Sequence, residues 1–468
     1  MAGNEEGQVS RVVRGGHWVV ALLLAVPVGL AGQAPPLTLA DALARADRGA
    51  FANRIAEGTA EAQSAPKLAA LKGILPSLRV EGGYVRTTDP IGAFGTALRQ
   101  RTITQADFDP RRLNYPSAVG NYGASLVLEQ PLLNVDAHLG RVAAARAADA
   151  ADATTEWTHA TTRLEVVRAY YGAVLAAERV ATLEAAARAA EAHVRQADAV
   201  VRAGLATRSD ELLAQVKAGE VEAALVGARG DASLALRQLA LLLGTPGDTT
   251  IAVPGELPAP DRVRQASADE SPRAEPERRG DVAAARLSLS AAQTDVLRAR
   301  SLYLPRLNAF GRYDWNSASR PWGGEKNWTV GIMASWSPFA GASELAELRA
   351  AGGREAAARA GAEAADARAR LEVEQAENAR RVALRRLEIA ERATLQSGEA
   401  HRIVARKYDG GLATVQELLD AAAIETQTRL GLSAAVYDAV VAEAARRQAL
   451  GLDVAALTAL ETGTQRTN

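Results

Sequence analysis

The phrase AGLATRSDELLAQ at residues 203–215 returns as GGLATVQELLDAA at residues 410–422, and this repetition decides how the chain is organised. Each copy stands between long, alanine-rich and charged stretches that are typical of helices. In each copy a glycine, Gly204 or Gly411, stands where a helix should stop, because glycine adopts the left-handed conformation at little cost. Both copies therefore predict the end of a long helix.

The residues after each glycine predict the start of a second helix. Thr207 is followed three residues later by Asp210, and Thr414 is followed in the same way by Glu417. Thr-x-x-Asp/Glu is a capping box, in which the two side chains satisfy backbone amides at a helix N-terminus. Each phrase is therefore expected to form a tight turn between two helices.

Other landmarks repeat in the same order. LPSLRVEGGY at 75–84 corresponds to LPRLNAFGRY at 304–313, and NYGASLVLEQPLL at 121–133 corresponds to WTVGIMASWSPFA at 328–340. Self-similarity in fixed order is the mark of an internal duplication. Each half is predicted to run helix, strand, strand, long helix, turn, helix.

The predicted organisation has five parts. They are a signal peptide (1–31), repeat 1 (37–245), a linker (246–278), repeat 2 (279–452) and a C-terminal tail (453–468). Four strands and two turns are expected within the repeats: strands at about 77–87 and 121–132 with a turn at 203–210, then strands at about 305–316 and 327–338 with a turn at 409–416.

The N-terminus resembles an export signal. Arg11 and Arg14 precede the apolar run WVVALLLAVPVGL at 18–30, and Gly29-Leu30-Ala31 offers a cleavage site. The alternative is a single membrane anchor, for which the run is short. The chain contains no cysteine, which excludes disulfides, thiolate metal sites and cysteine nucleophiles.

The helices before the turns are unusually long. In the first half the pattern extends from about 138 to 202, with apolar residues such as Val180, Leu183 and Ala187 spaced three and four apart, as in coiled coils. A helix of about 65 residues is about 100 Å long at about 1.5 Å per residue. The sequence therefore predicts rods rather than a compact helical domain.

The four expected strands alternate between an apolar and a polar face. The apolar face ends in aromatic residues that are expected to face lipid: Tyr84, Tyr122, Tyr313, Trp315, Trp328 and Trp336. An apolar face with aromatic ends opposite a polar face is typical of a transmembrane β-barrel. The alternative is an ordinary antiparallel sheet packed on helices, which gives the same alternation.

A membrane barrel requires several copies of this chain. Four strands cannot close a barrel, and open sheet edges are not tolerated in lipid. The fold class is therefore expected to be mostly α with a membrane β-barrel to which each copy contributes four strands. Two copies would give a barrel filled by its own side chains, and more copies would open a channel.

Other chemistry finds little support. The formal net charge is −1, which argues against nucleic-acid binding. The histidines, at positions 17, 138, 159, 193 and 401, make no ligand pair by spacing, so no metal site, cofactor or catalytic constellation is expected. The glycine-rich segment at 90–100 is interpreted as a loop.

Together these landmarks resemble the TolC-type outer-membrane efflux protein family over about 37–452. The resemblance rests on the duplication, on Leu-Pro-x-Leu before each first strand, on QPLL and SPF ending each second strand, and on the two Gly-Leu-Ala-Thr turns. It implies a homotrimer with one twelve-stranded barrel in the outer membrane of a Gram-negative bacterium and an α-helical barrel through the periplasm. It also implies partners, a periplasmic adaptor (membrane fusion protein) and an inner-membrane pump.

The resemblance assigns roles at the turns. The adaptor would contact the hairpin tips: Gly204, Leu205, Ala206, Thr207, Gly411, Leu412, Ala413 and Thr414. The periplasmic gate would comprise Glu417 and Asp420, the aromatic Tyr408, and its partners Ser209 and Asp210. A hydrogen bond from Tyr408 to Asp210 is expected in the closed state. Ala413 stands where the family's best-known member has a gating arginine, and Arg208 is a possible substitute.

Two functions from different classes follow. The first is a passive trimeric outer-membrane duct for efflux or type I secretion, exporting small molecules or polypeptides. The alternative is a periplasmic coiled-coil scaffold without a barrel, which would leave the strand alternation and its aromatic ends without a purpose. No residues support an exported enzyme.

Overall fold

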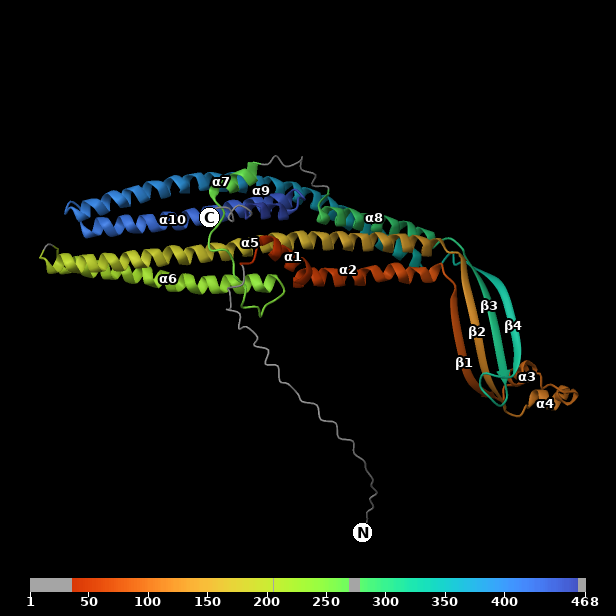
Figure 1. Ribbon diagram of the computed structural model, residues 1–468. Helices are drawn as coiled ribbons and strands as arrows, with labels where there is room; N and C mark the ends of the chain where they lie inside the picture. Colours follow the sequence, from red (N-terminus) through yellow and green to blue (C-terminus); the bar gives the residue numbers. More distant parts are fainter. Residues whose placement is uncertain (1–35, 205, 269–277, 462–468) are drawn as a thin grey trace, which may run out of the picture. The chain divides into compact units, whose positions relative to one another are not determined.

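The computed structural model describes residues 36–204, 206–268 and 278–461 (Figure 1). The expected signal peptide at 1–31 and Leu205 of the first turn lie outside the described residues. The described chain is mostly helical and carries four strands. No helix in the described ranges is both long enough and apolar enough to cross a membrane.

The four strands form one antiparallel sheet in the order β1-β2-β3-β4. Their bounds are β1 Ser77–Thr87, β2 Val119–Leu133, β3 Arg306–Ser317 and β4 Glu325–Ser335. β2 from the first half pairs with β3 from the second half, so the sheet joins the two repeats. Figure 1 shows the strands side by side, with β1 and β4 at the two edges.

The register of pairing sorts the side chains onto two faces. One row across the sheet contains Val80, Leu126, Tyr313 and Trp328 as successive partners. Because neighbouring rows point to opposite faces, the row beside it carries Glu81, Ser125, Asp314 and Asn327 on the other face. The structure thus places the apolar parities of all four strands on one face.

Neither face of the edge strands is covered. Nearly every residue of β1 and β4, of both parities, is exposed. The side chains of Val330 and Ile332 are each 68% exposed. The alternative of a sheet packed beneath the chain's own helices is therefore wrong for these two strands.

Two long helical hairpins make up most of the helical part. α5 Val135–Arg202 packs along α6 Arg208–Leu242, and α9 Ser343–Asp409 packs along α10 Val415–Ala449. α5 also contacts α10, which brings the two hairpins together (Figure 1). α5 has 68 residues and α9 has 67, so each is about 100 Å long at about 1.5 Å per residue.

Shorter helices lead into the sheet. α1 Leu39–Gly49 is followed by α2 Phe51–Ala69 and the 3₁₀ turn η1 Ala70–Gly73, which precedes β1. α8 Gly280–Ser301 precedes β3 in the second half. Both α2 and α8 pack against α5.

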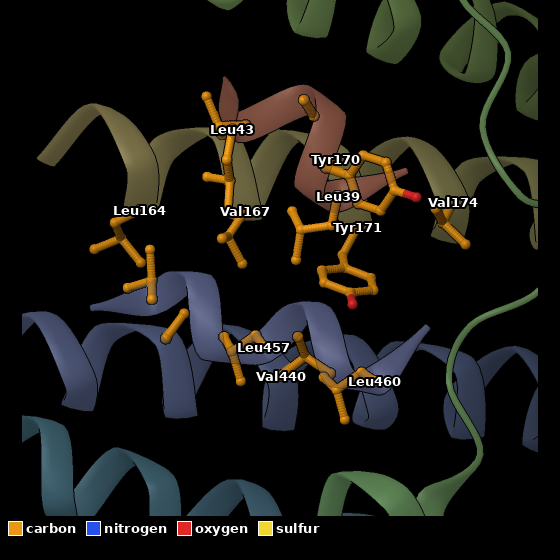
Figure 2. Close-up of a cluster of buried hydrophobic side chains, with 14 of the residues drawn as sticks. Leu39, Leu43, Leu164, Val167, Tyr170, Tyr171, Val174, Val440, Leu457 and Leu460 are labelled. Carbon is orange, nitrogen blue, oxygen red and sulfur yellow. The ribbon is translucent and has the colours of Figure 1, made fainter. Parts of the chain in front are cut away.

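The main hydrophobic core gathers both ends of the described chain. Figure 2 shows Leu39 from α1, Tyr170 and Tyr171 from α5, and Leu457 and Leu460 near the C-terminus. The last two belong to η4 Val454–Leu460, so this part of the expected tail is folded into the core. Glu461 completes the junction by accepting a hydrogen bond of 2.8 Å from the Leu39 amide.

The expected linker is also docked on the core. It contains α7 Pro260–Ala268, whose Val263 is 1% exposed. Arg264 pairs with Glu391 of α9 at 2.6 Å, and the Leu257 amide donates to Glu178 of α5 at 2.8 Å. Residues 269–277 of the linker lie outside the described residues.

The segment between β1 and β2 corrects one expectation. Residues 90–100 were expected to form a loop, but α3 Pro90–Arg99 is a helix, followed by η2 Gln105–Phe108 and α4 Pro110–Asn114. Asp89 caps α3 by accepting from the Gly92 amide at 2.6 Å, and proline at the first helical position is pre-organised for a helix. These two signals outweigh the low helix propensity of the glycines.

Candidate functional site

The first hairpin turn joins α5 to α6 as the repeated phrase predicts. Gly204 has a φ of +73°, which only glycine adopts readily, and its amide donates to the Val201 carbonyl at 2.9 Å. Asp210 accepts from the Thr207 amide at 2.9 Å, and the Thr207 hydroxyl accepts from the Asp210 amide at 3.4 Å. The capping box therefore begins α6.

The second turn has the same construction. Gly411 has a φ of +74°, and the Leu412 amide donates to the Lys407 carbonyl at 2.7 Å, which closes a Schellman motif. Glu417 accepts from the Thr414 amide at 2.7 Å, and the Thr414 hydroxyl accepts from the Glu417 amide at 3.2 Å. Two turns separated by half the chain are thus built from the same interactions.

The capping bonds stabilise the ionised carboxyls. The Thr207 amide, and then its hydroxyl, lower the pKa of Asp210 below its ordinary value. The Thr414 amide and hydroxyl lower the pKa of Glu417 in the same way. Both carboxylates are therefore charged at neutral pH while they hold their turns.

The two hairpins touch close to their turns. A small apolar cluster contains Ala197 of α5, Ala214 of α6, and Val415 and Leu419 of α10, with Tyr408 packed against it. Beside this cluster the Gln196 side chain donates to Asp409 at 3.0 Å. We call this region the tip junction, meaning the apolar cluster and the Gln196–Asp409 bond.

The expected gate acids lie on the exposed side of α10. Glu417 and Asp420 are exposed, whereas Val415, Leu418 and Leu419 are buried. Asp420 lies close to α6, because it raises the pKa of Lys217 after the larger effect of Glu220. Glu417 is occupied by its cap, which leaves Asp420 as the acid of this pair that faces solvent without a capping role.

The expected bond between Tyr408 and Asp210 is absent from this structure. Tyr408 is half-buried in the tip junction, and burial raises the pKa of its hydroxyl, with smaller effects from Asp210 and Asp409. Asp210 directs its carboxylate to Thr207 instead. The structure therefore places the two side chains near each other without a hydrogen bond.

The remaining residues of the first turn have different surroundings. Ser209 is exposed, and Arg208 pairs with Glu211 inside α6 rather than reaching another helix. Glu211 was overlooked in the sequence, yet its side chain is only 7% exposed and accepts from Gln215 at 3.0 Å. The sequence feature that indicates these contacts is the spacing, since an arginine precedes Glu211 by three residues and a glutamine follows it by four.

The tips themselves face solvent. Leu412 is 80% exposed, and Gly204, Thr207, Gly411 and Thr414 are also exposed. Ala206 and Ala413 are half-buried. This exposed leucine directly after Gly411 gives the second turn an apolar contact point.

A pair of histidines was also overlooked. The rings of His193 on α5 and His401 on α9 have centroids 6.3 Å apart. Their positions in the duplication differ by one residue, since His193 precedes Gly204 by eleven residues and His401 precedes Gly411 by ten. Within residues 36–204, 206–268 and 278–461, no group of three or more side chains is arranged to hold a metal ion.

The expected aromatic residues lie on or beside the apolar face of the sheet. Tyr84 faces Tyr122 directly across β1 and β2, with ring centroids 4.7 Å apart. Tyr313 and Trp315 share that face and touch each other, and Trp328 is 71% exposed. The expected strand 327–338 is too long at its end, because β4 ends at Ser335.

Trp336 therefore lies just beyond β4 rather than within it. It is 63% exposed, and its indole nitrogen donates to the Tyr303 carbonyl at 3.1 Å. An indole with an apolar exposed body and a satisfied N–H is typical of a membrane interface.

Comparison with protein families decides the classification. The sequence matches the family described as outer membrane efflux protein over residues 69–245 and 272–452, which is most of the chain and both halves of the duplication. The chain belongs to the outer membrane efflux protein family. Comparison with curated protein sequences gave no match.

Solved structures share the fold of this outer membrane efflux protein. The outer membrane protein VceC from Vibrio cholerae has a TM-score of 0.74 at 18% identity, covering 89% of this chain and 96% of that chain. The CmeC outer membrane channel of Campylobacter jejuni has a TM-score of 0.72 at 16% identity, covering 92% and 90%. The open state of the MtrE outer membrane channel of Neisseria gonorrhoeae has a TM-score of 0.70 at 18% identity, covering 89% and 89%.

Proposed function

We propose that three copies of this outer membrane efflux protein form a passive duct that carries small molecules across the periplasm and outer membrane of a Gram-negative bacterium. The observation that carries the proposal is the sheet. It has one continuous apolar face, exposed on the edge strands and largely half-buried on β2 and β3, and it ends in two unpaired edges. Membership of the efflux family supplies the class of function.

The sheet edges require partners of the same kind. β1 and β4 each have 11 residues, close to the length of a tilted transmembrane strand. Each presents a row of unpaired backbone groups on its outer side, which is costly in hydrocarbon. Pairing β1 of one copy with β4 of the next satisfies both rows, and three copies close a wall of twelve strands.

The polar face then lines the lumen. Its rows carry charged and amide side chains, including Glu81, Arg312, Asp314 and Asn327. Arg312 and Asp314 pair at 2.7 Å within β3. A polar interior opposite an apolar exterior is the arrangement of water-filled barrels.

The hairpin tips are proposed as both gate and docking surface. Repeated around a three-fold axis, Asp420 would form an acidic ring that favours cations. Glu417, Tyr408, Asp210 and Ser209 would surround it as the rest of the gate. Arg208, the arginine expected to substitute at Ala413, is engaged with Glu211, so closure is expected to depend on the tip junction.

The exposed tips, with Leu412 foremost, are the proposed contact for a periplasmic adaptor coupled to an inner-membrane pump. Export of polypeptides through a type I secretion system would use the same duct. A scaffold role would leave the exposed apolar face of the sheet without a purpose.

Conductance across planar lipid bilayers tests the proposal. The purified full chain should give discrete conductance steps that favour cations, and Asp420→Asn should lower the cation-to-anion permeability ratio by about twofold or more. Asp231→Asn, an exposed aspartate on α6 away from the turn, is the matched control and should leave the ratio unchanged. Absence of conductance would contradict the duct. An unchanged cation-to-anion permeability ratio in Asp420→Asn would contradict the acidic ring but not the duct.

A further inference from the structure

A titratable contact joins the two hairpins above the tip junction. His193 lies on α5 and His401 on α9, with their rings inclined at 72° and their centroids 6.3 Å apart. Glu425 of α10 holds His401 in place, with its carboxylate 2.5 Å from Nδ1. Three of the four long helices therefore meet at these side chains, which we call the histidine contact.

The two histidines line a cavity of about 450 Å³. Its wall mixes apolar side chains, such as Leu183 and Leu430, with charged side chains from α6 and α10. The charged groups that face it are already paired. Lys217 bonds to Glu220 on α6 at 2.9 Å, Arg429 bonds to Glu425 at 2.5 Å, and Asp409 accepts from Gln196.

Two ring nitrogens of the contact have no partner. His193 Nδ1 and His401 Nε2 are both buried and make no hydrogen bond. A proton added to His193 Nδ1 would be a buried donor without an acceptor, which is unfavourable. His401 differs, because the Glu425 carboxylate pairs with its other ring nitrogen at 2.5 Å. The contact as built therefore suits a neutral His193 ring.

We propose that the histidine contact is a pH-sensitive switch, which holds the two hairpins together while the ring of His193 is neutral and releases them when this ring is protonated. The inference rests on this geometry and not on the proposed transport function. No residue of the gate described above takes part in it. The apolar cluster of the tip junction remains as a second link, so release is expected to loosen the hairpin ends without unfolding them.

The direction of the pH dependence follows from His193. Burial lowers the pKa of His193, and His401 lowers it further, while Gln196 and Asp409 act in the opposite direction. A histidine with a lowered pKa in the folded state stabilises the fold fully above its ordinary pKa of about 6.5 and loses that contribution as the pH falls below it. The contact should therefore weaken on acidification.

Hydrogen–deuterium exchange of the full chain in detergent micelles tests the switch, with exchange times corrected for the intrinsic effect of pH. Between about pH 7.5 and about pH 5.5, peptides around residues 188–199 and 396–406 should lose protection by up to about tenfold for each unit of pKa shift. Peptides from the α5–α8 contact should keep theirs. Equal protection at both pH values would overturn the proposal.

Variants separate the histidine contact from general acid effects. His193→Gln should remove the pH response, because glutamine carries no charge at either pH, and His193→Asn should do the same if His193→Gln is poorly folded. His159→Gln is the matched control: His159 also lies on α5, but it faces Glu57 at 3.3 Å. A response that survives both test variants, or that is lost in His159→Gln, would contradict the proposal.

Discussion

Thr207 and Asp210 show how much of the turn is determined by single residues. Each side chain satisfies the backbone amide of the other, and Gly204 supplies the one positive φ that the reversal needs. Thr414, Glu417 and Gly411 repeat the arrangement. Because these interactions are local, the sequence alone predicted both turns.

Replacement of one cap tests this account of the turn. Thr207→Ala should destabilise the start of α6 by about 1 kcal/mol, because the backbone amide and the carboxylate of Asp210 both lose the Thr207 hydroxyl as a partner. Exchange of the amides in residues 206–212 should quicken accordingly. Ser209→Ala, one residue into the same helix turn and exposed, is the matched control and should show no comparable change.

Low pH should destabilise the start of α6 in the same way as Thr207→Ala. The lowered pKa of Asp210 means that its stabilising effect is complete above the ordinary value of 3.8 and is lost as the pH falls below it. Asp210→Asn should be less protected at neutral pH and should show no further loss in this acid range. If amide protection at the tip is the same in the wild type, in Thr207→Ala and in Asp210→Asn, the capping model is contradicted.

The contacts and the burial of individual helical residues in the folded chain could not be predicted from the sequence. His193 and His401 are 208 positions apart and met only when α5 and α9 came together. Glu211 is buried by its own Arg208 and Gln215, a pattern that usually lies on a solvated surface. Local spacing identifies caps, but it does not identify which helix faces meet.

The strands are the elements whose position the sequence predicted best. A period of two is unambiguous over ten residues, and the expected segment at 77–87 coincides with β1 Ser77–Thr87. The register between β2 and β3 could not be predicted, because it depends on pairing between the two repeats. α3 was missed because its glycines obscured the Asp89-Pro90 start signal.

A charge on the apolar face tests the role of β4. Val330→Asp places a carboxylate on the face that we propose meets lipid, at a cost below the about 2–4 kcal/mol of a lysine or arginine near the bilayer centre. Insertion into lipid vesicles should fall sharply, as measured by flotation. Thr329→Asp, the next residue on the polar face, is the matched control and should insert like the wild type. Equal insertion of both variants would contradict the assignment of faces.

At the scale of the molecule, duplication explains the two matched hairpins and the pairing of β2 with β3. The core explains how the halves are held together, because α1 and η4 pack on α5 (Figure 2) and the linker packs on the same core. The sequence did not reveal the docked linker and tail. The apolar residues of the linker, such as Ile251, are few, and the three-residue period of Val454, Leu457 and Leu460 in the tail extends over only one short segment.

The account's central claim is that the sheet closes only between copies, β1 against β4. The chain has no cysteine, so introduced pairs react without background. We would combine Gly83→Cys in β1 with Asn327→Cys, Thr329→Cys or Gly331→Cys in β4 and oxidise the protein in outer membranes. Single-cysteine variants are the controls.

The account predicts that at least one pair gives covalent dimers and trimers on a denaturing gel and nothing larger, since three copies complete the wall. A chain that stays monomeric in every pair would contradict closure between copies. A ladder that continues beyond the trimer would contradict a closed ring of three.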